Sequence, residues 1–189
     1  MSNQAITPAN ITEIVRAKWG WFLVLGIVFI ISGFFALIAP FQASVLVTVV
    51  VAIVLVISGV LQIFQAWSVQ SWTGFLWQLV IGLILLVGGI AIYFNPIEYT
   101  YLLTLFAAAV FLAKGIFQII LGFRLKPQDA WGWIVSAGIV AMLVGVLIFM
   151  EYPFSGSFAL GVLAGISLLF TGWSYIAIAL AARQSKSVA

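Results

Sequence analysis

The sequence predicts an all-α integral membrane protein with six transmembrane helices, arranged as three tandem helical hairpin repeats of parallel orientation. The chain of 189 residues is 66% hydrophobic and only 6% charged, and its mean hydropathy is +1.32. A soluble domain carries about 25% charged residues, so this chain lacks the polar surface that a soluble protein needs. The two other observations are a set of long apolar segments and a repeat that relates them.

The apolar segments have the length of transmembrane helices. A helix of about 20 apolar residues spans the ~30 Å hydrocarbon layer of a bilayer. The breaks at Pro40, Pro96 and Pro153 contain proline. Because proline lacks an N–H and clashes with the preceding helical turn, we expect helices to end there. The six predicted segments are Trp19–Ala39, Ala43–Ala66, Phe75–Phe94, Tyr99–Phe123, Trp131–Met150 and Phe158–Ala182.

A repeat of 56 residues relates the segments. Trp21, Trp77 and Trp133 follow one another at this interval, and the third repeat is one residue longer before its proline. Each first helix has two glycines seven residues apart, on one face, and each second helix has a late glycine. A missing side chain lets another helix approach closely in lipid. We therefore predict helix packing at Gly26, Gly33, Gly59, Gly82, Gly89, Gly115, Gly138, Gly145 and Gly172.

The repeat sets the predicted organisation of the chain. We expect an N-terminal tail (1–18), hairpin repeats at 19–70, 71–126 and 127–183, and a C-terminal tail (184–189). Asn10 and Glu13 resemble a helix cap and its partner, so 11–18 is either a short helix or a disordered tail. Since a two-helix unit returns to its starting side, all three copies share one orientation. This predicts a pseudo-threefold arrangement about the membrane normal, unlike the inverted repeats of many transporters.

The charged residues predict the orientation in the membrane. All the basic residues near the ends of the predicted spans fall on the side that holds the two termini. The opposite side has Glu98 and Glu151. Positive residues favour the cytoplasmic side, so both termini are predicted to be cytoplasmic. The basic residues concerned are Arg16, Lys18, Arg124, Lys126, Arg183 and Lys186.

Polar residues occupy matched positions in the second helix of each repeat. Residues four apart share a helix face, and buried amides and hydroxyls usually hydrogen-bond between transmembrane helices, so a structural role is favoured for most of them. The members of this polar tier are Ser58, Gln62, Lys114, Gln118, Thr171 and Tyr175.

Lys114 differs from the rest of the polar tier because it is charged and lies about 15 Å along the helix from Arg124. A charged lysine at the centre of a span costs roughly 2.5–3.5 kcal/mol, and every acidic residue lies at or beyond the span ends. One hypothesis places Lys114 at the centre of the bundle near Gln62, Gln118 and Tyr175. The other has the side chain stretching through thinned lipid to the inner surface.

Several functions are excluded or disfavoured. The chain has no Cys and no His, which excludes disulfides and the usual nitrogen and sulfur metal ligands. No acid pair or nucleophile with a neighbouring base is visible, so we predict no enzyme activity, no metal and no cofactor. The net charge of +3 does not indicate nucleic-acid binding. Gly161 and Gly165 form a GxxxG motif that serves either dimerisation or, the favoured reading, packing within the chain.

The repeats resemble the HdeD-like acid-resistance membrane proteins of bacteria, which are six-helix proteins built from hairpin repeats. The resemblance implies a multi-pass protein of the bacterial cytoplasmic (inner) membrane that is linked to acid survival, with no catalytic residues to assign. It rests on WFLVLGIVFIISGFFALIAP (21–40) with ISGVLQIFQA (57–66), WQLVIGLILLVGGIAIYFNP (77–96) with AKGIFQIILGFR (113–124), and WIVSAGIVAMLVGVLIFMEYP (133–153) with FTGWSYIAIAL (170–180).

Two functions follow from these observations. The favoured one is a non-catalytic protein of acid or envelope stress protection, whose partners are the lipid bilayer and either another membrane protein or a second copy of this chain. The alternative is a conduit or transporter for protons or a small solute through the helix bundle. If the protein senses external acid, Glu98 and Glu151 are the candidates, although both residues could serve only to set topology and solvate the turns.

Overall fold

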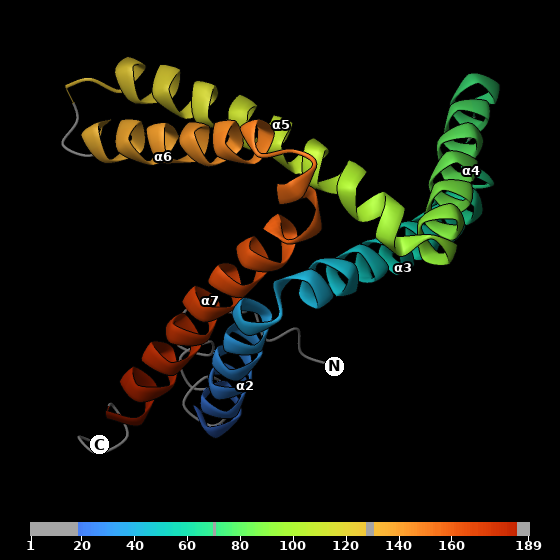
Figure 1. Cartoon of the computed structure of the whole chain (residues 1–189). Coiled ribbons are helices and arrows are strands. Elements are labelled where there is room, and N and C mark those ends of the chain that lie inside the picture. Colours follow the sequence, from blue (N-terminus) through green and yellow to red (C-terminus); the bar gives the residue numbers. More distant parts are fainter. Residues whose placement is uncertain (1–18, 70, 128–130, 185–189) are drawn as a thin grey trace, which may run out of the picture. The chain divides into compact units, whose positions relative to one another are not determined.

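The structure is a computed structural model that describes residues 19–69, 71–127 and 131–184. These ranges form six long α-helices, each long and apolar enough to cross a membrane, and no strand (Figure 1). The predicted all-α class with six membrane-spanning helices is confirmed. The predicted helix or tail at 1–18 lies outside the described residues, as does 185–189. The elements are α2 (Trp19–Ile38), α3 (Pro40–Ala66), α4 (Trp72–Phe94), α5 (Pro96–Arg124), α6 (Trp131–Met150), η1 (Phe154–Ser157) and α7 (Ala159–Gln184).

Two prolines begin helices instead of lying in loops between them. Pro40 is the first residue of α3 and Pro96 the first residue of α5. The expectation that these helices start about three residues later, at Ala43 and Tyr99, was wrong. Proline is well suited to the first helical position because the N–H that it lacks has no partner there. In the third repeat the proline does not begin the second helix. There α6 ends at Met150, and the 3-10 helix η1 lies between it and α7.

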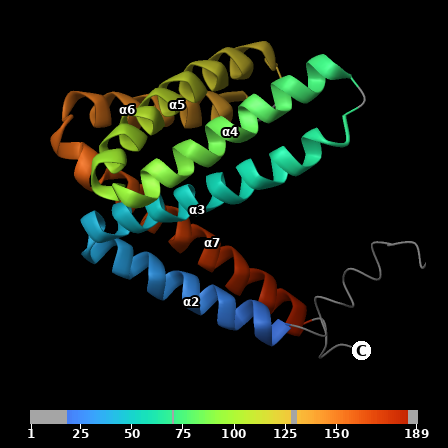
Figure 2. The same cartoon turned by 90° about the vertical axis from the view of Figure 1, so that its right-hand side faces the viewer.

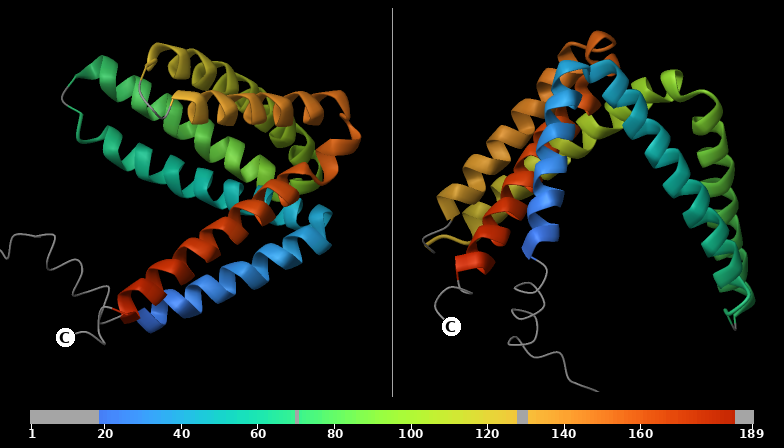
Figure 3. Two further views of the ribbon diagram at one scale, coloured as in Figure 1. Left: turned by 90° about the vertical axis from the view of Figure 1, so that its left-hand side faces the viewer. Right: turned by 90° about the horizontal axis from the view of Figure 1, so that it is seen from below.

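The chain forms two compact units, of which the first combines α2 with α7 from Val162 onward. These two helices lie side by side (Figure 3) and approach closely at their glycines. A Cβ atom on Gly26 would lie 2.9 Å from the carbonyl oxygen of Gly172, and one on Gly33 would lie 2.9 Å from that of Gly165. The backbones can pack this closely only because these side chains are absent.

The second unit, Pro40–Gly161, contains two more helix pairs, α3 with α4 and α5 with α6 (Figure 2), and α3 also contacts α5. A Cβ atom on Gly59 would lie 2.8 Å from the carbonyl oxygen of Gly82. One on Gly115 would lie 2.7 Å from that of Gly138. Each pair therefore uses the same glycine contact as α2 and α7.

The packed pairs join neighbouring repeats. In each pair, the late glycine of one repeat meets the first glycine of the next repeat, and Gly172 of the third repeat meets Gly26 of the first. By contrast α4 and α5, the two helices of the second repeat, make few contacts with each other. The second helix of a repeat thus packs on a helix from the following repeat, which differs from a hairpin that packs on itself.

Candidate functional site

Lys114 lies on the exposed face of α5. The buried face of this helix contains Ala108, Gly115 and Gly122, and all three of these residues face α6. Lys114 precedes Gly115 by one residue, which turns its side chain by about 100° away from that face. The amine is therefore on the outer surface of the α5–α6 pair. The hypothesis that Lys114 lies at the centre of the bundle near Tyr175 stays a prediction.

Gln62 and Gln118 belong to different helix pairs. Gln118 is half-buried, and its Cβ atom lies 3.0 Å from the place that a Cβ on Gly138 would occupy, so it is directed toward α6. Its Oε1 atom is buried and has no hydrogen-bond partner among the described residues. Gln62 is half-buried on α3, next to Ile63, which packs against Gly82 of α4. The polar tier does not converge on one point in the second unit.

The polar tier residues of α7 have partners close by. The ring of Tyr175 is half-buried between Phe22 and Phe29 of α2, with ring centroids 5.9 Å and 5.6 Å away. The Thr171 hydroxyl donates to the Ser167 carbonyl oxygen at 2.8 Å, within its own helix. In the second unit, the equivalent Ser58 of α3 is half-buried. Tyr175 therefore packs between α7 and α2, whereas the Thr171 hydroxyl bonds within its own helix.

The most deeply buried polar groups of the described residues were missed by sequence reasoning. They are serine and threonine hydroxyls, and their residues are at most 2% exposed. They lie at the helix ends where the proline turns are, which we call the outer ends. Three hydrogen bonds connect α3, α5 and the segment from η1 to the first turn of α7 in a closed cycle. These bonds join Thr48 Oγ1 to Thr100 Oγ1 (2.8 Å), Thr104 Oγ1 to the Gly156 carbonyl (3.1 Å), and the Gly161 N–H to Ser44 Oγ (2.8 Å).

This hydroxyl cycle follows the sequence repeat. Ser44 and Thr100 occupy matching positions 56 residues apart, as do Thr48 and Thr104. Hydroxyl residues four apart near the start of two second helices, at the repeat interval, were the signal that could have found the cycle. Carbonyls of the same helix also lie within reach of each threonine hydroxyl, as the Pro96 carbonyl oxygen does at 2.7 Å from Thr100 Oγ1. Because a hydroxyl has one proton, one of Thr48 and Thr100 donates to the other while the second donates to its own helix. The cycle therefore fastens the outer ends of these helices together and keeps its hydroxyls bonded.

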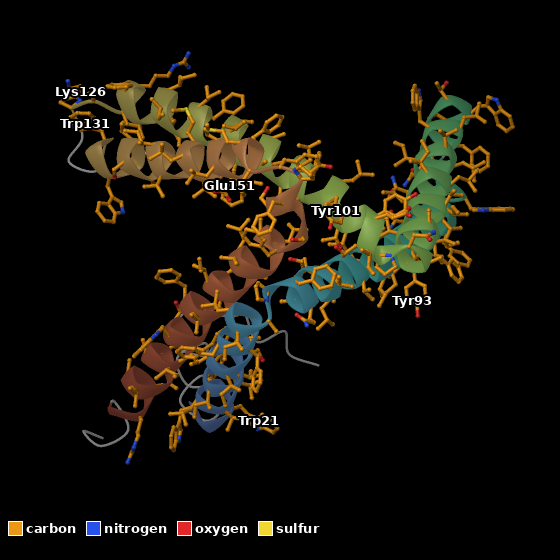
Figure 4. The ribbon with its side chains drawn as sticks, in the orientation of Figure 1. Trp21, Tyr93, Tyr101, Lys126, Trp131 and Glu151 are labelled. Atoms are coloured by element: carbon orange, nitrogen blue, oxygen red, sulfur yellow. The ribbon has the colours of Figure 1, made fainter. Side chains whose placement is uncertain are left out.

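The two outer glutamates have different surroundings. Glu98 is exposed in the first turn of α5, where the helix dipole favours a carboxylate. Glu151 directly follows α6 and lines an open cleft of about 450 Å³. Figure 4 shows Glu151 and Tyr101 close to the junction of α6, η1 and α5. The other lining residues are Met150, Tyr152, Pro153, Phe154 and Ser157.

Basic side chains at the opposite, inner ends of the helices lie against tryptophan rings. The Nζ atom of Lys126 is 4.7 Å from the ring centroid of Trp131, and the Cζ atom of Arg183 is 5.5 Å from that of Trp19. Cation–π contacts of this kind suit a membrane interface, where tryptophan and basic residues gather. Among the described residues, no three His, Cys, Asp or Glu side chains group together as metal ligands.

Six apolar helices with a recurrent glycine contact define a multi-span membrane protein with an internal repeat. Two segments, residues 24–94 and 80–150, match the family described as a short repeat of unknown function (DUF308). The second match begins (80 against 24) and ends (150 against 94) 56 residues after the first, which is the interval found in the sequence. Because the matches together cover more than half of the chain, the protein belongs to this family. No curated protein and no solved structure matches it.

Proposed function

We propose that this protein is a non-catalytic, HdeD-like protein of the bacterial cytoplasmic membrane that protects the envelope during acid stress by associating with another membrane protein. The resemblance of its repeats to HdeD-like proteins supports the stress role. The basic residues on one side of the spans support a cytoplasmic location for both termini.

The observation that carries this proposal is the exposed position of Lys114 on the side of α5 that faces away from α6. The amine lies on a face of α5 that is otherwise apolar and exposed, with Val110 47%, Phe117 72% and Leu121 50% accessible. A lysine that faces lipid at mid-depth costs roughly 2.5–3.5 kcal/mol. A partner helix with a carboxylate at the same depth would remove most of that cost, because an opposite charge stabilises the ammonium.

A second copy of this chain is a poorer partner for this face. A symmetric dimer on this surface would bring two lysines together, and the described acidic residues, Glu98 and Glu151, lie at the ends of the spans and not at the depth of Lys114. The GxxxG glycines are already used within the chain, since Gly161 faces Pro40 and Ser44 while Gly165 faces Gly33 and Leu37. A different membrane protein therefore fits the surface better than a homo-oligomer does.

The conduit alternative has less support. Proton relays in membranes use chains of acidic or histidine side chains, whereas here the amine is exposed on α5 and the buried hydroxyls bond to a second hydroxyl or to the backbone. The observation that favours the conduit is Gln118, whose buried Oε1 atom has no hydrogen-bond partner among the described residues.

Acid survival of bacteria that lack the gene tests the proposal. Expression of the wild type should restore survival, Lys114→Arg should also restore it, and Lys114→Met should not, because only the first two present a cation to the partner. Membrane levels of the three proteins must match. Failure of the wild type to restore survival would exclude the stress role, and equal rescue by Lys114→Met would exclude the lysine-dependent partner.

Proton flux in proteoliposomes under an imposed pH gradient distinguishes the alternative. We expect the same flux with wild type, with Lys114→Met and without protein; flux that depends on Lys114 would favour the conduit. In the survival assay, Glu98→Gln combined with Glu151→Gln tests the predicted acid sensors. Survival equal to that of wild type would remove both glutamates as sensors and leave them a role in topology.

A further inference from the structure

The cleft beside Glu151 has an unusual lining for a surface hollow. Three aromatic rings, those of Tyr101, Tyr152 and Phe154, surround it together with a single carboxylate. None of the described residues that line it is Lys or Arg, and no described basic residue forms an ion pair with Glu151. Its volume of about 450 Å³ lies within the range of roughly 300–1,000 Å³ that is usual for small-ligand sites.

The turn that lines the cleft is built differently from the turns of the first two repeats. In the first two repeats the proline begins the second helix directly, at Pro40 and Pro96. In the third repeat the extra residue before Pro153 is accompanied by the 3-10 helix η1 between α6 and α7. The departure from the repeat therefore places Glu151, Tyr152 and the Phe154 ring of η1 around the hollow.

The walls of the cleft are held in place by specific contacts. The Ser155 hydroxyl donates to the Ile148 carbonyl at 2.6 Å, which fixes η1 to the end of α6. The Gly156 carbonyl accepts from Thr104 of α5, so η1 is also part of the hydroxyl cycle. The ring of Tyr101 lies directly over Gly156, because a Cβ atom there would be 2.6 Å from Tyr101 Cδ1. Gly156 thus determines the position of one aromatic wall.

Aromatic faces combined with one carboxylate form a surface that is suited to an organic cation. The negative faces of the rings attract an ammonium group, and recognition of choline-like ligands uses the same arrangement. The carboxylate adds a charge-assisted hydrogen bond. The Ser157 hydroxyl, which donates to the Phe154 carbonyl at 2.8 Å, keeps free lone pairs that can accept another. A phosphate or carboxylate ligand that carries no ammonium group would instead meet the negative charge of Glu151.

We propose that the cleft of Glu151, Tyr101, Tyr152 and Phe154 binds an alkylammonium group, either in the headgroup of an ethanolamine phospholipid or in a free amine. The cleft is open at the outer end of the helices, where tyrosines lie at the level of lipid headgroups. Both sources carry the same ammonium chemistry. This site goes beyond the proposed function and does not depend on Lys114.

Lipid retention and amine titration test this site with the full chain in nanodiscs. The first arm uses native mass spectrometry to compare retention of phosphatidylethanolamine with that of phosphatidylglycerol. The second arm titrates free ethanolamine, by calorimetry, into protein in nanodiscs of phosphatidylglycerol alone. Selective retention of the ethanolamine lipid without heat from the free amine identifies a lipid site. Saturable heat from ethanolamine identifies a free-amine site.

The variants connect either signal to the cleft. Glu151→Gln keeps the shape and removes the charge, so we expect it to weaken the signal by at least about fivefold. Glu98→Gln is the matched control, because it removes the other outer carboxylate and should leave the signal unchanged. Gly156→Ala keeps every charge but displaces the Tyr101 ring, and should also weaken binding. Helicity and thermal unfolding identify any variant that fails to fold.

Two results would overturn the proposal. One is the absence of both signals in wild type, with the two lipids retained equally and no saturable heat. The other is an equal loss in Glu98→Gln and Glu151→Gln, which would indicate general attraction to a negative surface instead of a site.

Discussion

Two adjacent glycines of α4 show how sharply the packing depends on single residues. A Cβ atom on Gly89 would lie 2.8 Å from the Val56 nitrogen and 2.9 Å from the Ala52 carbonyl oxygen, whereas one on Gly88 would have nothing within 4 Å. Gly89 has the repeat spacing and Gly88 does not. The recurrent glycine is the one that allows two backbones to meet.

Gly89→Ala should therefore destabilise the α3–α4 pair, while Gly88→Ala should not. The added methyl group of Gly89→Ala meets backbone atoms of α3, which cannot rotate away, so we expect a loss of about 1–3 kcal/mol. Gly88→Ala adds a methyl group to open space and slightly favours the helix. Reversible unfolding in mixed detergent micelles, followed by circular dichroism, measures both. Equal stability of the two variants would contradict the close packing at Gly89.

At the scale of elements, the hydroxyl cycle determines how α3 and α5 meet. Thr48 and Thr100 contact each other through their hydroxyls at 2.8 Å, and both side chains are almost completely buried. Buried hydroxyls in a membrane have no water to bond when the helices separate, although they find alternative partners. For this reason, such bonds contribute only about 0.6 kcal/mol on average and about 1.7 kcal/mol at most.

A double-mutant cycle with Thr48→Val and Thr100→Val should show a coupling energy of about 0.5–1.5 kcal/mol. Valine keeps the shape of threonine and removes only the hydroxyl. Thr171→Val is the matched control, because the Thr171 hydroxyl bonds only to its own helix at Ser167, so it should show no coupling with Thr48→Val. The same unfolding assay reads out the energies. Additive effects of Thr48→Val and Thr100→Val would mean that the two hydroxyls do not stabilise each other.

The elements could largely be predicted from the sequence, whereas their partners could not. Hydropathy located all six helices, because each must be apolar over its whole length to lie in lipid. The repeat showed that Gly59 and Gly115 occupy equivalent helix faces, but it does not determine which other helix packs against each face. That choice depends on tertiary packing between segments, here between one repeat and the next.

The candidate sites were harder to predict for the same physical reason. Lys114 is next to Gly115 in sequence, and only the contact of Gly115 with α6 shows that Lys114 is turned away from α6. The extra residue before Pro153 was visible in the sequence, but the cleft that accompanies it depends on how Tyr101 of α5 lies over Gly156. Contacts between distant segments decide both features, and periodicity alone does not determine them.

At the scale of the whole molecule, charge and topology decide which side of the membrane each feature faces. Arg124 and Arg183 lie in the last turns of α5 and α7, at their inner ends, and Lys126 follows α5, while Glu98 and Glu151 lie at the outer ends. Positive residues are retained on the cytoplasmic side. The cleft of Glu151 is therefore predicted to face away from the cytoplasm.

Single cysteines test this orientation cleanly, because the natural chain has no cysteine to give background labelling. Asn95→Cys lies between α4 and α5, where the Asn95 side chain makes no capping hydrogen bond, and Lys126→Cys follows α5. In intact cells, a membrane-impermeant maleimide should label Asn95→Cys and should label Lys126→Cys only after permeabilisation. Labelling of both in intact cells would contradict the single crossing of α5. The reverse pattern would place the cleft in the cytoplasm, so any amine bound there would have to come from that side.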